Sequence, residues 1–208
     1  MPGIVVSVPS PSLDGMVNLT RIYTRTGDDG TTGYGGRGRI SKNDSRLEAY
    51  AGCDEAGAFL GVALASGALT DDVAAVLTRV QNDLFDVGAD LCTPIEPAPR
   101  ENQYPPLRVA QEQVDALERE IDRFNADLEP LRSFVLAGGT PAAAHLHVAR
   151  TVVRRAERAT WRAVEAHPDT VNPLTATYLN RLSDLLFVLA RHANREVGDV
   201  LWVPGANR

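Results

Sequence analysis

The stretch that decides the fold is DDVAAVLTRVQNDLFDVGADL, residues 71–91. Its apolar side chains recur at spacings of three and four over about five turns, which is typical of a helix with one buried face. These side chains are Val73, Val76, Leu77, Val80, Leu84, Val87 and Leu91. So long a stripe needs other helices to cover it, and the sequence therefore predicts a helical bundle.

Similar apolar periodicity before and after this stretch predicts the other helices. We expect them over residues 45–67, 110–128, 141–166 and 175–193. In the first of these, the expected buried face consists of Leu47, Tyr50, Ala51, Ala58 and Val62. No alternation with strands and no internal repeat is visible, so we predict one all-α domain, an antiparallel bundle of about five helices.

Turn residues mark where these helices begin and end. Thr140 and Pro141 have the residue types of an N-cap and a first helical position, and Pro168 stops the helix that they begin. Five prolines between residues 92 and 108 predict an irregular crossover. We expect residues 1–18 to be a flexible lead-in and residues 19–208 to form the domain.

Composition limits the class of protein. The chain has 208 residues, of which 44% are hydrophobic and 23% charged, and its formal net charge is −6. These values fit a soluble globular domain and disfavour general nucleic-acid binding. Cys53 and Cys92 form no CxxC pair, no apolar run reaches the roughly 20 residues of a membrane span, and the N-terminus lacks a basic region of the signal-peptide type. We therefore expect a cytoplasmic protein that is not bound to a membrane.

A loop rich in glycine, threonine and aspartate precedes the helices, at residues 24–33. Binding of a triphosphate needs backbone N–H groups, hydroxyl groups and positive charge that converge on its oxygen atoms. This stretch and its neighbour Lys42 offer all three, with Asp28 available to help hold a metal ion that the phosphates also bind. It lacks the GxxxxGK[ST] pattern of a Walker A loop, and a glycine-rich loop of this composition is more often a plain surface turn.

A row of arginines is the second candidate site. Five arginines lie between residues 150 and 162, and Arg150, Arg154 and Arg158 recur every four residues on one helical face. Like charges at that spacing repel, so an anion should offset them. Salt bridges to acidic neighbours, or plain solvation, are the structural alternative. Asn180 and Asp184 lie four residues apart on a leucine-rich helix and predict either a helix-packing pair or contact with a ligand or with the arginines.

Other catalytic groups are not evident in the sequence. His145 and His147 are two residues apart on a predicted helix, so they cannot easily chelate one metal ion, and a structural role is the simpler interpretation. No Ser/His/Asp or Cys/His set stands out. The residues that ligate any metal ion stay unknown at this point.

Six motifs in order give the chain a family resemblance. They are TRTGDDGTT, AYAGCDEAGAFLG, QNDLFDVGADL, FVLAGG, LHVARTVVRRAER and YLNRLSDLLFVLAR. With them the chain resembles the ATP:cob(I)alamin (corrinoid) adenosyltransferases of the propanediol-utilisation type, over residues 19–204. The resemblance implies a five-helix bundle, a homotrimer, and active sites between subunits. It implies transfer of the 5′-deoxyadenosyl group of ATP to the cobalt of cob(I)alamin, which yields adenosylcobalamin and inorganic triphosphate.

The resemblance also assigns roles to residues. The ATP loop it implies consists of Thr24, Arg25, Thr26, Gly27, Asp28, Asp29, Gly30, Thr31, Thr32 and Gly33, together with Lys42. The contacts it implies from the facing subunit are Arg154, Arg155, Glu157, Arg158 and Asn180. Arg150 matches the arginine that pairs across the interface with an aspartate, here Asp54. Phe134 matches the aromatic residue that crowds the lower face of the corrin.

Cofactors and partners follow from the same resemblance. ATP and cobalamin are the expected substrates and Mg²⁺ the expected metal ion, with a reductase and an adenosylcobalamin-dependent mutase as partners. The sequence departs from the family pattern at Ala137, which replaces a proline, and at Ala56 and Gly57, which are smaller than usual. The alternative function is a non-catalytic bundle that binds ATP or corrinoid as a sensor or carrier.

Overall fold

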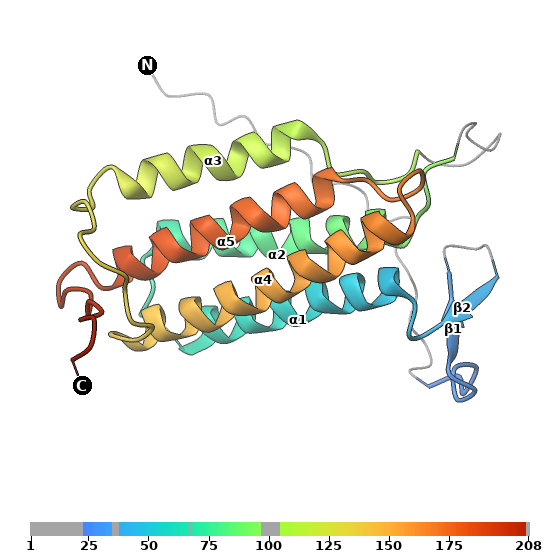
Figure 1. Ribbon diagram of the computed structural model, residues 1–208, viewed down its shortest axis with the longest axis horizontal. Helices are drawn as coiled ribbons and strands as arrows, with labels where there is room; N and C mark the ends of the chain where they lie inside the picture. The colour runs from blue at the N-terminus through green and yellow to red at the C-terminus, as the bar shows by residue number, and fades with distance from the viewer. Residues whose placement is uncertain (1–22, 35–37, 67, 97–104, 207–208) are drawn as a thin grey trace, which may run out of the picture.

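A computed structural model of the chain describes residues 23–34, 38–66, 68–96 and 105–206. Within these residues, five helices lie side by side along the long axis, and a small hairpin lies beyond one end of them (Figure 1). The helices are α1 (Ser45–Ser66), α2 (Asp71–Leu91), α3 (Gln111–Asn125), α4 (Pro141–Ala166) and α5 (Leu174–Ala193). The predicted lead-in, residues 1–18, lies outside the described residues. No helix of the described part is long and apolar enough to cross a membrane.

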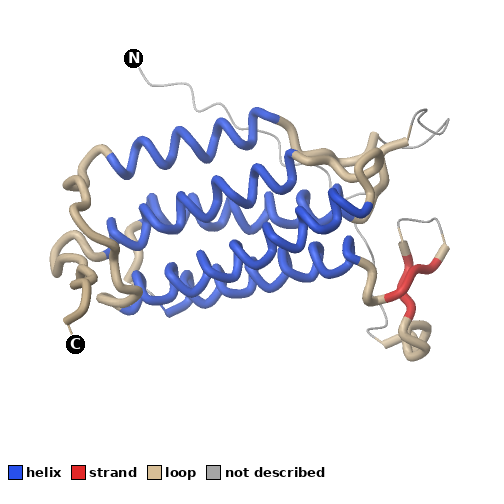
Figure 2. The backbone as a smooth tube through the Cα atoms, in the orientation of Figure 1, coloured by secondary structure: helices blue, strands red, loops and turns tan. Residues whose placement is uncertain are grey.

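Helix α2 confirms the pattern from which the fold was predicted. All seven members of its apolar stripe are buried, from Val73 to Leu91. The core is shared among the helices, because α1 packs against α2 and α4, and α5 packs against α3 and α4 (Figure 2). Burial of this continuous apolar surface is the main favourable contribution to folding.

The predicted ends of the later helices are largely confirmed. Thr140 accepts a hydrogen bond from the Ala143 amide at 3.2 Å, and Pro141 opens α4, which ends at Ala166. Helix α5 begins one residue before the predicted start. Helix α3 is shorter than predicted, since the chain leaves the helix after Asn125 and Leu128 closes a turn onto the Asn125 carbonyl instead.

The predicted buried face of α1 is wrong. The core side of this helix is formed by Arg46, Ala49, Cys53, Ala56, Leu60 and Ala63. In contrast, Tyr50, Ala51, Ala58 and Val62 are exposed, and Leu47 is half-buried. Small apolar residues lie on every face of this helix, so apolar periodicity could not identify the side that meets α4. The end predicted at Gly67 lies outside the described residues.

The glycine-rich stretch contains a hairpin that the sequence did not predict. Strand β1 (Thr31–Gly33) pairs antiparallel with β2 (Arg39–Ser41), with Thr32 opposite Ile40. The hairpin follows the loop of residues 24–30 and leads directly into α1 (Figure 1). The predicted ligand loop is therefore held on one side by a short sheet.

Candidate functional site

In the loop at residues 24–33, some backbone N–H groups have no hydrogen-bond acceptor among the described residues. The Thr24 and Thr26 hydroxyls hydrogen-bond each other at 2.9 Å, while the Gly30 amide donates to the Gly27 carbonyl at 3.3 Å. Arg25 has a positive φ of 63°, which is uncommon for a residue with a side chain and marks a tight bend. Among the described residues, the amides of Thr26 and Gly27 have no acceptor, so these donors are available to a ligand.

Lys42 closes one side of this loop. Its amide donates to the Gly30 carbonyl at 2.9 Å, so the backbone of the two segments is joined. A Cβ atom added at Gly27 would lie 3.1 Å from the Lys42 Nζ atom and 3.0 Å from the Thr31 carbonyl oxygen. Glycine therefore leaves room for the lysine ammonium beside the loop backbone, and a larger residue would crowd the Thr31 carbonyl and displace the lysine slightly.

An arginine that the sequence analysis did not select organises the loop. Arg39 on β2 donates from Nε to the Thr31 hydroxyl at 2.7 Å, and from Nη2 to the carbonyls of Thr26 and Thr31. The Asp29 carboxylate accepts from the Thr31 amide at 3.0 Å and from its hydroxyl at 2.7 Å. These bonds hold the pKa of Asp29 below its usual value, the Thr31 hydroxyl being the largest cause and the Arg39 charge a lesser one. The Asp29 carboxylate is thus engaged inside the loop. The Asp28 amide donates to the Arg25 carbonyl at 3.4 Å, but the Asp28 carboxylate is not bound by a described residue.

The arginines of α4 differ in the residues that they contact. Arg155 forms an ion pair with Glu55, and Arg162 forms one with Glu48 at 2.7 Å, both across to α1. These two arginines are therefore salt-bridged to acidic neighbours within the chain, which was the structural alternative to anion binding. Arg158 donates to the Arg154 carbonyl at 3.1 Å, which leaves the rest of its exposed guanidinium at the surface.

Arg154 belongs to a small group that bridges α4 and α5. It donates from Nη1 to Glu157 Oε2 at 2.6 Å, and Asn180 Nδ2 donates to Glu157 Oε1 at 3.2 Å. Glu157 is buried, whereas the Arg154 side chain is 44% exposed. The buried carboxylate therefore fixes one edge of the guanidinium and leaves the other nitrogens free to bind an anion. We call Arg150, Arg154, Glu157 and Asn180 the arginine cluster.

A hollow of about 370 Å³ lies next to this cluster, between α4 and α5. Arg150, Arg154, Ser183, Asp184 and Phe187 line it together with Val188. The Nε atom of Arg150 is buried without a hydrogen-bond partner among the described residues. A cavity with two guanidinium groups and one carboxylate suits an anionic ligand better than an apolar one.

One turn before Arg150, His147 is buried and adjoins the Phe187 ring at a centroid distance of 6.2 Å. Neither ring nitrogen has a hydrogen-bond partner among the described residues, so the predicted structural role is not satisfied in the ordinary way. Burial lowers the pKa of His147, and the Arg150 charge lowers it further. The imidazole is therefore neutral at pH 7.

Asp54 lies apart from the arginine cluster. It is exposed on α1, at a hollow of about 250 Å³ between α1 and α2 that Tyr50 and Phe85 also line. The same hollow includes Gly57, where an added Cβ would meet Leu84 at an ordinary 3.9 Å. The absence of a side chain at Gly57 thus opens space here. Burial raises the pKa of the nearby Cys53 thiol to about 12, so this thiol is not a nucleophile at neutral pH.

Phe134 lies in the segment that leads into α4 and is 77% exposed. Its ring faces Trp202 near the C-terminus, with ring centroids 5.9 Å apart and a tilt of 56°. No spacing pattern in the sequence links Trp202 to Phe134. Two segments about seventy residues apart in sequence thus present one pair of aromatic rings.

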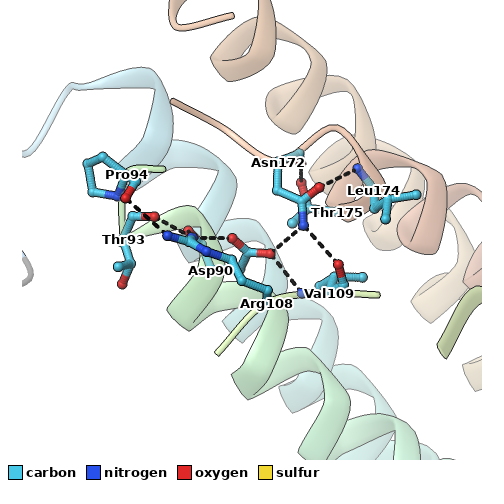
Figure 3. Close-up of polar contacts among 8 residues, drawn as sticks. All are labelled: Asp90, Thr93, Pro94, Arg108, Val109, Asn172, Leu174 and Thr175. Carbon is cyan, nitrogen blue, oxygen red and sulfur yellow. Dashed lines mark hydrogen bonds and ion pairs between the residues drawn. The ribbon is translucent and has the colours of Figure 1, made fainter. Parts of the chain in front are cut away.

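A second polar cluster has the opposite character. Asp90 is fully buried, and its carboxylate accepts hydrogen bonds from Arg108, from the Val109 amide at 2.8 Å and from Asn172 at 2.7 Å (Figure 3). Arg108 also donates to the carbonyls of Thr93 and Pro94 (Figure 3). We call Asp90, Arg108 and Asn172 the Asp90 cluster. Every strong acceptor in it is saturated by the protein, so it is a structural tie between α2, the segment before α3 and the segment before α5.

Within one chain, the predicted site residues form separate groups. The loop residues and Lys42 come together beside the hairpin, and the arginine cluster comes together between α4 and α5. No hydrogen bond or ion pair between described residues joins the loop to the arginine cluster. Asp54 and Arg150, likewise, form no ion pair with each other within the described chain.

Three comparisons with known proteins agree. The family model described as Cobalamin adenosyltransferase matches residues 22–193. A corrinoid adenosyltransferase of Mycobacterium bovis is 60% identical over 192 residues, which is 92% of this chain and 97% of that protein. The corrinoid adenosyltransferase PduO of Salmonella typhimurium is 42% identical over 171 residues, which is 82% of this chain and 48% of that protein.

A solved structure has the same fold. It is a variant of the PduO-type ATP:corrinoid adenosyltransferase from Lactobacillus reuteri, complexed with cobalamin and ATP. It superposes with a TM-score of 0.77 at 34% sequence identity, and the match covers 88% of this chain and 99% of that chain. By sequence and by structure, the chain belongs to the cobalamin adenosyltransferase family.

Proposed function

We propose that the protein transfers the 5′-deoxyadenosyl group of ATP to the cobalt of cob(I)alamin, which yields adenosylcobalamin and inorganic triphosphate. The observation that carries this proposal is the arginine cluster. Its Arg154 is fixed by a buried carboxylate and directs its remaining donors toward a hollow that also contains Arg150. Such a pre-positioned cation stabilises a polyanion that gains charge as it departs.

The reaction needs alignment more than acid–base chemistry. The Co(I) electron pair forms the new bond to C5′ of ATP, the C5′–O bond breaks, and its electrons leave with triphosphate. No proton has to be abstracted in this step, which fits a site without a candidate base or activated nucleophile. The task of the protein is then to hold ATP and corrinoid in line and to stabilise the leaving group.

We assign ATP to a site shared by two subunits of a homotrimer. One subunit supplies the loop of residues 24–33 and Lys42, with its free amides and its lysine ammonium. The facing subunit supplies Asn180 and the α4 contacts Arg154, Arg155, Glu157 and Arg158. Supporting this division, the loop and the arginine cluster do not meet within the described part of a single chain. The antiparallel bundle provides the rigid frame for both halves.

Mg²⁺ fits this site as an ion bound mainly by phosphate. Among the described residues, no group of three His, Cys, Asp or Glu side chains converges on one point, so this part of the chain offers no cage of its own. Asp28 is the loop carboxylate left over, since Asp29 is engaged by Thr31. Mg²⁺ prefers phosphate oxygens, waters and one or two carboxylates. When bound, it would neutralise part of the triphosphate charge.

The corrinoid is assigned to the exposed surface around Phe134. An apolar side chain against the lower face of the corrin displaces the lower ligand of cobalt, which makes reduction to Co(I) easier. Arg150 is expected to pair with Asp54 of the neighbouring subunit beside this site. In support, the Arg150 side chain lines the hollow between α4 and α5, and it forms no ion pair with a described residue.

The cellular setting is an extension of the same proposal. A reductase has to supply Co(I) or Co(II), and an adenosylcobalamin-dependent mutase would use the product. We place these steps in the cytoplasm, with the free thiols of Cys53 and Cys92 in support.

One assay distinguishes adenosyl transfer from the alternative functions. The protein is incubated with ATP, Mg²⁺ and chemically reduced cobalamin, and adenosylcobalamin and phosphate products are quantified. Equal amounts of adenosylcobalamin and triphosphate are expected. Formation of ADP would indicate a phosphotransferase, and binding without any product would indicate a sensor or carrier. Either result would overturn the proposal.

A further inference from the structure

The Arg39 side chain grips two parts of the loop of residues 24–33 at once. Its Nε atom donates to the Thr31 hydroxyl at 2.7 Å, and its Nη2 atom donates to the carbonyls of Thr26 and Thr31. A guanidinium nitrogen of this kind carries two N–H groups, so each carbonyl can receive one of them. Because the three bonds end on both Thr26 and Thr31, the planar guanidinium fixes these two residues relative to each other.

The Thr31 hydroxyl extends this constraint to Asp29. A hydroxyl has one proton to donate, and that of Thr31 goes to the Asp29 Oδ1 atom at 2.7 Å. The Thr31 proton is therefore not available to a phosphate oxygen. The Arg39 Nη2 atom lies 3.9 Å from the same Oδ1 atom, so the guanidinium charge offsets a carboxylate that would otherwise repel a polyanion bound in this loop.

The bond to the Thr26 carbonyl decides where the next amide points. The peptide bonds of the described residues are trans, so the N–H of Gly27 points opposite to the C=O of Thr26. Arg39 holds that carbonyl, and the Gly27 amide consequently points away from Arg39, with no acceptor among the described residues. The Thr26 amide is fixed in direction in the same way, because the Arg25 carbonyl before it accepts from the Asp28 amide at 3.4 Å.

The residue before Thr26 has a strained backbone. Arg25 has a φ of 63°, a left-handed conformation that is unfavourable for a residue with a side chain and persists only where other contacts hold it. The bond that its own carbonyl accepts, at 3.4 Å, is long and therefore weak. Arg39 supplies a second, charge-assisted restraint one residue later, at the Thr26 carbonyl. Without this restraint the bend at Arg25 would relax, and the Gly27 amide would change direction.

Lys42 places a positive charge beside the same amide. A Cβ atom added at Gly27 would lie 3.1 Å from the Lys42 Nζ atom, so the ammonium and the Gly27 N–H are close neighbours. An ammonium and a free amide N–H side by side suit the oxygen atoms of a phosphate. The Arg39 donors named above are, in contrast, already bound to the loop backbone and the Thr31 hydroxyl.

We propose that Arg39 is a positioning residue for ATP: it directs the Gly27 amide toward the triphosphate beside Lys42 and does not itself bind the phosphates. This inference rests on the proposed function, which places ATP in this loop, and it adds a residue outside the assigned ATP contacts. A loop that is already held in its bound form pays less conformational entropy when the ligand binds. Arg39 should therefore raise the affinity for ATP.

The test compares two arginines of similar exposure. Arg39→Ala is matched with Arg79→Ala, since the Arg79 side chain is 45% exposed against 40% for Arg39 and forms only an ion pair with Glu120. The Kd of ATP with Mg²⁺ is measured by calorimetry without corrinoid, and kcat and KM are measured with chemically reduced cobalamin. We expect Arg39→Ala to raise Kd and KM for ATP about tenfold. Saturating ATP should restore kcat to within about twofold, with KM for cob(I)alamin unchanged. Arg79→Ala should match the wild type.

Two further variants separate positioning from charge. Arg39→Lys keeps the charge but lacks the planar fork, so its Kd for ATP should stay close to that of Arg39→Ala. Wild-type affinity in Arg39→Lys would overturn the inference, because charge alone would then suffice. Thr31→Val removes the hydroxyl that the Arg39 Nε atom binds. It should weaken ATP binding in the wild type and have no further effect in Arg39→Ala, and additive effects of the two substitutions would contradict the proposed coupling.

Loss of Arg39 could also loosen the protein more widely, so amide hydrogen exchange of the ligand-free proteins accompanies the binding measurements. We expect faster exchange in Arg39→Ala at residues 24–30, with exchange in α1 and the urea midpoint unchanged. Weaker ATP binding without faster loop exchange would make Arg39 a direct phosphate ligand, and faster exchange through α1 would give it a general structural role; either result overturns the inference. If the wild type binds ATP but forms no adenosylcobalamin, the proposed function fails while the comparison of Kd values remains valid.

Discussion

The two polar clusters between the helices differ in how completely the protein satisfies them. In the Asp90 cluster, Asp90 is fully buried and accepts bonds from a guanidinium, an amide N–H and an asparagine. In the arginine cluster, Glu157 is satisfied, but Arg154 is half-exposed and the Nε of Arg150 has no partner among the described residues. The Asp90 cluster joins α2 to the segments before α3 and α5, and the arginine cluster joins α4 to α5. Among the described residues, only the arginine cluster has spare donors.

The difference separates stabilisation from function. A buried charge with all its partners holds the fold, and removal of one partner leaves the others desolvated and unpaired. A cluster with unused donors contributes less to folding, but those donors can bind an anion without rearrangement. Mutations in the two clusters should therefore have opposite signatures, one in stability and the other in activity.

The largest expected effect is a loss of stability when Asp90 is replaced. Asp90→Ala leaves Arg108 and Asn172 without their acceptor, so we expect the free energy of unfolding to fall by about 3 kcal/mol or more. The turnover number of the protein that stays folded at low temperature should be unchanged. Urea unfolding and a single-turnover assay at that temperature measure the two quantities. A loss of turnover with full stability would contradict the structural role.

Arg154→Ala should give the reverse result. Removal of a fixed donor from the leaving triphosphate should lower kcat by about 100- to 1,000-fold. The urea midpoint should fall less than in Asp90→Ala, because Asn180 still donates to the buried Glu157. The matched control is Arg162→Ala, on the same helix, which removes only an exposed ion pair with Glu48 and should leave kcat unaltered. Wild-type turnover in Arg154→Ala would remove this residue from the proposed site.

Two asparagines, one in each cluster, allow a second comparison of stability with activity. Asn172 donates to Asp90 and to the Val109 carbonyl, whereas Asn180 donates to Glu157 and accepts from Arg181 at 2.7 Å. We expect Asn172→Ala to cost about 1–2 kcal/mol of stability with unchanged KM for ATP. We expect Asn180→Ala to lower kcat/KM for ATP about tenfold with nearly unchanged stability. Similar effects of the two substitutions on both quantities would mean that the clusters do not differ in role.

The smallest expected effect concerns pH. His147 faces Arg150 from its own helix and Asp199 from the segment after α5, and burial lowers its pKa below the usual value of about 6.5. On acidification, the unfolded chain therefore takes up this proton before the folded chain does, so stability falls below about pH 6.5 until the lower, folded pKa is passed. His147→Phe removes this contribution. The loss of urea midpoint between about pH 7 and pH 5 should be smaller in the variant, and an identical loss in both proteins would exclude the effect.

The helices could be predicted because their signals are local. The stripe of α2 and the cap at Thr140 depend on neighbouring residues, and both are confirmed by the structure. The buried face of α1 could not be predicted, since alanine and glycine surround the helix. What decides it is tight packing at Gly52, where an added Cβ would lie 3.0 Å from Ala156 on α4. That contact joins residues far apart in sequence.

The site could be predicted only in part for the same reason. The loop and the arginine row stand out in sequence because each is a dense local run of unusual residues. Arg39 lies within such a run, but its hydrogen bonds to Thr26 and Thr31 depend on the hairpin. Trp202 carries no local signal at all, since its contact with Phe134 exists only after two distant segments pair.

The central claim is that the loop and the arginine cluster are two halves of one ATP site, contributed by different subunits. Lys42→Ala and Arg154→Ala, each inactive alone, are produced with different tags and purified as mixed oligomers. In every mixed trimer, one of the three sites pairs an intact loop with an intact α4, so adenosylcobalamin formation should return to about a third of the wild-type rate. If mixed oligomers stay as inactive as their parents, the two halves are not shared between subunits and the account is wrong.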